Sequence, residues 1–103
     1  MSQAVTEASN LVAAGPGRYL ISGPLGLEQV QGLLAFPYAD GVVAYTIDLS
    51  GVTAADSAAL ALMLYWQRET KQRDCLVCYV NLPERLRSLI ELYDLHGIVQ
   101  LAE

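Results

Sequence analysis

The chain has 103 residues, of which 53% are apolar, so it is long and hydrophobic enough to bury one core. Its 11 acidic residues outnumber its 6 basic ones, which disfavours a phosphate-rich partner such as nucleic acid. No apolar run reaches the ~18 residues of a membrane span, and Met1 to Asn10 lack the pattern of a signal peptide. We therefore expect one cytoplasmic domain over residues 1–103, with residues 1–9 flexible and both cysteines reduced.

The first part of the chain predicts a hairpin and a helix. Two short strands, 11–14 and 19–21, flank a Gly-Pro-Gly sequence that favours a tight turn. Residues 22–26 have the composition of a loop. Apolar residues at helical spacing then predict a modest helix over 27–36, which the following proline ends.

The rest of the chain alternates apolar strands with helices. The β-branched run 42–49 is typical of a central strand buried on both faces, and a loop is expected after it. A long helix over 57–73, a strand over 76–80, a helix over 83–93 and a last strand over 98–101 follow. This order predicts a small α/β domain with three to four helices and a mostly parallel sheet, opened by the hairpin and joined by right-handed crossovers.

The start of the long helix carries the most informative site signal. Asp56 and Ser57 stand where the helix begins, and either side chain is suited to accept hydrogen bonds from free backbone N–H groups. A helix N-terminus also favours negative charge, so a phosphate on Ser57 would be tolerated there. The residues leave three uses open: capping, phosphorylation and contact with a partner. Capping is compatible with the other two.

The same helix begins with nine consecutive apolar residues, Ala58 to Trp66. At about 3.6 residues per turn, such a run places apolar side chains on every side of the helix. One side packs on the sheet, and another needs a cover from a neighbouring helix or from a partner protein. The small size of the domain favours the partner. Tyr65 and Trp66 are also residue types that anchor interfaces.

Other reactive residues give weaker signals. Cys75 and Cys78 have C-x-x-C spacing, but positions three apart in a strand face opposite sides, so we expect two buried, unreactive thiols. His96, the only histidine, suits a helix C-terminus better than a triad or a metal site. Asp48 and Asp56 could approach each other across the expected loop, but no further acid–base partner accompanies them. We expect no catalytic site, cofactor or metal.

One set of residues resembles a known family. Asp48-Leu49-Ser50, Val52 and Asp56-Ser57-x-x-Leu60, in front of an apolar helix, resemble the pattern of the STAS domain. The predicted order of strands and helices is similar to that fold along nearly the whole chain. Residues 57–66, 81–86 and 92–93 further resemble the MlaB type. MlaB-type proteins are small cytoplasmic STAS subunits of a Gram-negative ABC transporter that moves phospholipids between the inner and outer membranes.

The resemblance implies a non-catalytic subunit that binds the ATPase subunit, of MlaF type, and supports the assembly or activity of the complex. That complex also contains permease and lipid-binding subunits and maintains outer-membrane lipid asymmetry. The protein would lie at the inner membrane through this complex without inserting into the bilayer. In the family the hydroxyl residue after the aspartate lies at the ATPase contact. The residues expected at this contact are Asp56, Ser57, Ala58, Leu62, Tyr65, Trp66 and Tyr93.

The antagonist branch of the same family implies an alternative function. There the protein is an anti-sigma factor antagonist, and a kinase phosphorylates the serine that corresponds to Ser57. The family usually has glycine two residues after this serine, where this chain has Ala59. Glycine permits close approach by a partner's backbone, so the alanine disfavours a tight antagonist–kinase contact.

Overall fold

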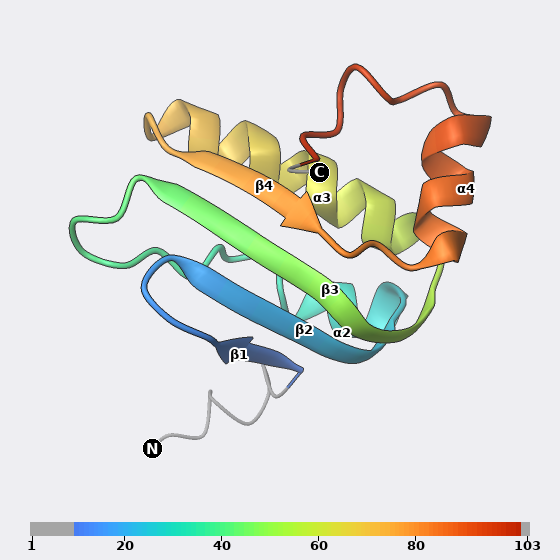
Figure 1. The fold of residues 1–103 in the computed structure, drawn as a ribbon, viewed down its shortest axis with the longest axis horizontal. Coiled ribbons are helices and arrows are strands. Elements are labelled where there is room, and N and C mark those ends of the chain that lie inside the picture. Colours follow the sequence, from blue (N-terminus) through green and yellow to red (C-terminus); the bar gives the residue numbers. More distant parts are fainter. Residues whose placement is uncertain (1–9, 102–103) are drawn as a thin grey trace.

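The computed structural model describes residues 10–101, so the flexibility expected for residues 1–9 lies outside the described part. Its strands and helices alternate along the chain, as Figure 1 shows. In chain order they are β1 (Leu11–Ala13), β2 (Arg18–Leu25), α2 (Leu27–Gln31), β3 (Ala44–Ala55), α3 (Ser57–Gln72), β4 (Leu76–Val80) and α4 (Glu84–Leu92). The predicted small α/β domain is confirmed.

The four strands form one sheet in the order β1-β2-β3-β4. β1 pairs antiparallel with β2, whereas β2 with β3 and β3 with β4 are parallel. These pairings confirm the hairpin and the mostly parallel sheet. The strand expected over 98–101 is reduced to a single parallel bridge between Tyr79 and Leu101. β4 therefore lies at one edge of the sheet.

The described helices lie behind the sheet or beside its end in Figure 1, and the face turned toward the viewer carries none. Along β3 the side chains of Tyr45 and Ile47 are buried, whereas Thr46 and Asp48, which alternate with them, are only half-buried. The prediction of a strand buried on both faces is therefore wrong. The apolar residues of β3 fill one face, whereas the β3 side chains on the second face, from Ala44 to Ser50, are small or polar.

β2 and β3 are both longer than the sequence indicated. β2 runs to Leu25 and β3 to Ala55, so the loops expected at 22–26 and after Leu49 are absent. The pairing between the two strands shifts register twice over these stretches. Each shift is a β-bulge, in which one extra residue enters β3. The bulges let both strands continue through glycine, serine and proline, residues that otherwise favour turns.

An aromatic cluster occupies the core between the sheet and the helices. Trp66 is 1% exposed, and its indole N–H donates to the Leu33 carbonyl at 3.0 Å. The ring meets Phe36 edge-on, with 5.3 Å between the ring centroids. A helix was expected to continue through residues 32–36, but α2 ends at Gln31 and these residues are not helical. Instead they form a loop that brings the Phe36 ring and the Leu33 carbonyl to Trp66.

The domain itself covers almost all of the apolar start of α3. Of the nine residues from Ala58 to Trp66, five are buried, two are half-buried, and only Ala61 and Tyr65 are exposed. Both α2 and α4 pack against α3, which rests on the sheet. Of the two covers expected for this helix, a neighbouring helix or a partner, the partner was favoured; this preference is corrected, because two flanking helices supply the cover.

Gly17 and Gly97 provide a test of the packing around the hairpin. Gly17 has φ +70°, and a Cβ there would lie 2.7 Å from the Ala44 carbonyl oxygen. We expect Gly17→Ala to lower the free energy of unfolding by about 1–3 kcal/mol, through strain and the close contact. A Cβ at Gly97 would meet nothing within 4 Å, so Gly97→Ala is the control and should change this energy by less than about 1 kcal/mol. Urea unfolding followed by circular dichroism measures both, and equal losses would contradict the prediction.

Candidate functional site

Asp56 and Ser57 have different roles at the N-terminus of α3. Asp56 is the N-cap, and its carboxylate accepts a hydrogen bond from the Ala58 N–H at 2.8 Å. Ser57 is the first helical residue, so capping falls to the aspartate. Both side chains are exposed, at the point where β3 ends. The Ser57 hydroxyl therefore lies at the positive end of the helix but is not its cap.

A mostly apolar groove of about 410 Å³ lies between α2 and α3. Leu34, just after α2, is 45% exposed, and Tyr65 on α3 is 38% exposed. Ser57, Ala61, Tyr65 and Arg68 follow one another at helical spacings of four and three residues, so they share one side of α3. We call these four residues the α3 face. The face connects the exposed serine with the groove.

The seven residues expected at the contact fall into two groups. Five are exposed or half-buried: Asp56, Ser57, Ala58, Tyr65 and Tyr93. Leu62 and Trp66 are each 1% exposed and belong to the core, so their interpretation as contact residues is corrected. Neighbouring residues of a helix point in directions about 100° apart, and for this reason Trp66 faces inward while Tyr65 faces solvent.

Sequence reasoning missed Leu34 as a surface residue. Its spacing relative to Leu27 and Val30 predicted a place on the buried side of a helix that ends before Pro37. Because α2 stops at Gln31, this spacing no longer applies, and the side chain of Leu34 lies at the surface beside the groove. The early end of α2 has no clear signal in the sequence other than Gly32, which forms its C-cap.

The end of α4 exposes a second apolar pair. Leu92 is the last residue of the helix and Tyr93 its C-cap, and they are 73% and 54% exposed. The following residue, Asp94, has φ +56°, and Leu95 N–H donates back to the Ile90 carbonyl at 2.8 Å. This geometry is a Schellman motif, which ends the helix and leaves both apolar side chains in solvent.

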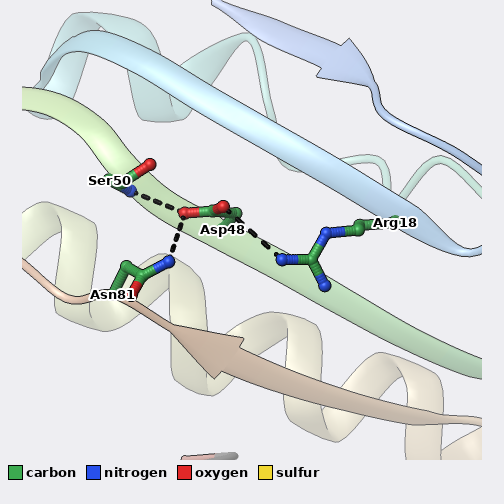
Figure 2. Close-up of polar contacts among 4 residues, drawn as sticks. All are labelled: Arg18, Asp48, Ser50 and Asn81. Atoms are coloured by element: carbon green, nitrogen blue, oxygen red, sulfur yellow. Dashed lines mark hydrogen bonds and ion pairs between the residues drawn. The ribbon is translucent and has the colours of Figure 1, made fainter.

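On the uncovered face of the sheet, Asp48 connects β3 with Arg18 on β2 and with Asn81 just after β4, as Figure 2 shows. Its Oδ1 accepts hydrogen bonds from the Ser50 N–H at 2.9 Å and from Asn81 Nδ2 at 3.1 Å. Its Oδ2 lies 3.6 Å from a guanidinium nitrogen of Arg18. The backbone bond from Ser50 is the main cause that lowers the pKa of Asp48, with further help from Asn81 and Arg18. The carboxylate therefore has a structural role.

The structure also corrects the expectation that Asp48 and Asp56 could approach each other. β3 stays extended from one residue to the other, where a loop was expected. Because the two bulges take up two of the eight residues, the separation is about six strand steps of ~3.3 Å, or roughly 20 Å. The two carboxylates therefore cannot act as an acid–base pair.

Cys75 and Cys78 are both free and both half-buried, so the expectation of fully buried thiols is wrong. Cys78 alternates with the buried Val77 and Tyr79 and therefore lies on the uncovered face of the sheet. Among residues 10–101, no group of three or more His, Cys, Asp or Glu side chains is arranged to hold a metal ion. None of the helices in this range is long and apolar enough to cross a membrane.

Comparisons with known proteins agree with this fold. Residues 22–101 match a family model described as "Mlab, STAS domain". The chain is also similar to the structure of the anti-sigma factor antagonist SpoIIAA in its unphosphorylated form. That likeness has a TM-score of 0.57 and 16% sequence identity, and it covers 80% of each chain. At this identity it shows a shared fold. No curated protein sequence matches the chain.

Asp48 makes the stability of the fold depend on pH. Because the pKa of folded Asp48 lies below its ordinary 3.8, the charged carboxylate stabilises the fold above about pH 4. This contribution is lost as the pH falls through the folded pKa. We expect Asp48→Asn to lower the free energy of unfolding by about 1 kcal/mol at neutral pH, and by less in acid. Urea unfolding at several pH values measures the difference.

The control for this prediction is Asp40→Asn, because Asp40 is exposed in the loop before β3. It should leave the free energy of unfolding unchanged within about 0.5 kcal/mol at neutral pH. A loss for Asp48→Asn that stays the same from neutral to acidic pH would contradict the assigned role of the charge.

Proposed function

This chain belongs to the STAS domain family, whose members are generally non-catalytic and mediate protein–protein interactions, and we propose that it is an MlaB-type subunit of a phospholipid-transporting ABC complex. It binds the MlaF-type ATPase subunit on the cytoplasmic side of the inner membrane and supports the assembly or activity of the complex. In this way it helps to maintain outer-membrane lipid asymmetry. The match of residues 22–101 to the family model described as "Mlab, STAS domain" carries this proposal.

The α3 face supports the proposal as a docking surface. Ser57 and Ala61 are small, so a partner helix can approach α3 closely there. Tyr65 and Leu34 border the groove of about 410 Å³, which offers room for an apolar side chain of the partner. An exposed aromatic residue beside such a groove has the character of an interface anchor. Asp56 contributes by fixing the first turn of α3.

We assign Tyr93 to the same contact as a second element. Together with Leu92 it presents exposed apolar surface at the end of α4, and α4 packs against α3. The buried residues Leu62 and Trp66 act indirectly: they hold α3 in the rotation that exposes Tyr65. Their replacement would therefore weaken binding through the fold, whereas replacement of Ser57 would act at the surface itself.

Co-expression with the cognate ATPase subunit tests the α3 face. We expect Ser57→Arg, which places a long cation in the contact, to reduce co-purification by at least about tenfold, equivalent to about 1.4 kcal/mol. Tyr65→Ala should have a similar effect. Ala14→Arg is the matched control, because Ala14 is an exposed small residue just after β1, at the edge of the sheet opposite β4, and it should leave co-purification unchanged. Full co-purification and transport activity with Ser57→Arg would overturn the proposal.

The exposure of Ser57 at the positive end of α3 favours one alternative, an anti-sigma factor antagonist switched by phosphorylation. A phosphate on this serine would be stabilised by the helix and would repel or obstruct a partner. Intact mass spectrometry of the protein from its native host distinguishes the two functions. The alternative predicts a fraction with the mass of one added phosphate, lost in Ser57→Ala; its absence in every growth phase would exclude the alternative.

A further inference from the structure

The C-terminal half of α3 has a hollow on each side. One is the groove of about 410 Å³ between α2 and α3. The other, of about 610 Å³, lies between α3, the start of β4 and the segment after α4. Leu64 and Arg68 are four residues apart on α3, and each of them lines both hollows. They form a ridge with a hollow on either side, and the α3 face continues onto this ridge.

The outer wall of the larger hollow is held in place by Gln67. Its Nε2 donates to the Ile98 carbonyl at 2.8 Å, and its Oε1 accepts from the Gln100 N–H at 2.6 Å. Ile98 and Leu76 line this hollow, and they are 55% and 46% exposed. The larger hollow therefore offers apolar surface to a partner, on a wall that the side chain of Gln67 fixes against α3.

The charge at this ridge is opposite to that of the chain as a whole, whose net charge is −5. In the described part of the chain, the charged side chains that line the two hollows are cations, Arg68 and Lys71, and both are exposed. Neither forms an ion pair within residues 10–101. Glu69, between them in the sequence, is half-buried and lines neither hollow. The end of the ridge is therefore complementary to a carboxylate on a partner.

A ridge between two hollows fits a helix of a partner. When two helices pack, side chains of one enter the hollows beside a ridge of the other. Ser57 and Ala61, toward the other end of the α3 face, are small and allow a helix to approach closely. At about 1.5 Å per residue, the stretch of α3 from Ser57 to Arg68 spans roughly 16 Å, so about three turns of a partner helix cover it.

We propose that the segment of the ATPase subunit that docks on the α3 face is an acidic, amphipathic helix, and that Arg68 and Lys71 select it by charge. Its apolar side chains enter the two hollows, and a carboxylate lies between the two cations. This inference rests on the function proposed above and adds the chemistry of the partner segment. Exposed charges of this kind raise the rate of association and disfavour partners with a cation at the same place.

Binding kinetics of the full chain with the cognate ATPase subunit test the role of the charges. We expect Arg68→Gln/Lys71→Gln to weaken binding about three- to tenfold at low salt, chiefly through slower association. The difference from the wild type should shrink as salt screens the charges. Arg68→Lys keeps the charge and should bind nearly as the wild type does.

The matched control is Ala13→Glu/Ala14→Glu. It lowers the net charge by the same amount as Arg68→Gln/Lys71→Gln, but at exposed positions on the edge of the sheet opposite β4. It should slow association by less than about twofold, because the added charges lie away from the ridge. Circular dichroism verifies that all variants fold.

Hydrogen exchange of the ATPase subunit identifies the segment that the wild-type chain protects. We expect a helix that carries an aspartate or glutamate beside apolar residues. Replacement of this acidic residue by lysine should weaken binding of the wild type and restore binding of Arg68→Glu/Lys71→Glu.

A protected segment without an acidic residue would overturn the inference. So would unchanged kinetics of Arg68→Gln/Lys71→Gln together with loss of binding in Ser57→Arg, and this result would leave the proposed function intact. Absence of binding by the wild-type chain would instead overturn the proposed function, and the inference with it.

Discussion

Trp66 holds α3 on one face of the sheet, since its ring is buried and its indole N–H donates to the Leu33 carbonyl at 3.0 Å. This contact sets the rotation of the helix about its own axis. With Trp66 inward, Ser57 and Tyr65 must face solvent, and Gln67 must face the segment after α4. The docking surface proposed on the α3 face follows from this rotation. A helix turned by one residue would bury the tyrosine and release the C-terminal segment.

The one-sided arrangement of helices also determines what the second face of the sheet must do. Without a helix above it, that face needs polar contacts between strands. Asp48 supplies them by linking β3 to Arg18 on β2 and to Asn81 after β4 (Figure 2). The nearby bulge leaves the Ser50 N–H directed at this carboxylate rather than into the ladder. An aspartate that looked like part of a site pattern is thus a connection within the sheet.

Patterns in the sequence predicted those helices and strands that are determined mainly by interactions between residues near one another in the chain. The apolar run from Ala58 to Trp66 and the polar residues after it predicted a helix over 57–73, close to the observed Ser57–Gln72. The position of Asp56 and Ser57 at its start also followed from the residues alone. By contrast, the continuation of β3 past Leu49 depends on bulges formed with β2, and local propensity favours a turn there. Contacts between distant residues could not be predicted, among them Gln67 with Ile98 and Trp66 with Leu33.

The bridge between Tyr79 and Leu101 closes an edge of the sheet that would otherwise be open. Tyr79 N–H donates to the Gln100 carbonyl at 3.0 Å, and the side chain of Gln67 bonds the backbone of Ile98 and of Gln100. Under this segment Val77 on β4 is 0% exposed. An exposed edge strand is a template for pairing with the sheet of another molecule. The segment after α4 therefore protects β4 from edge-to-edge aggregation.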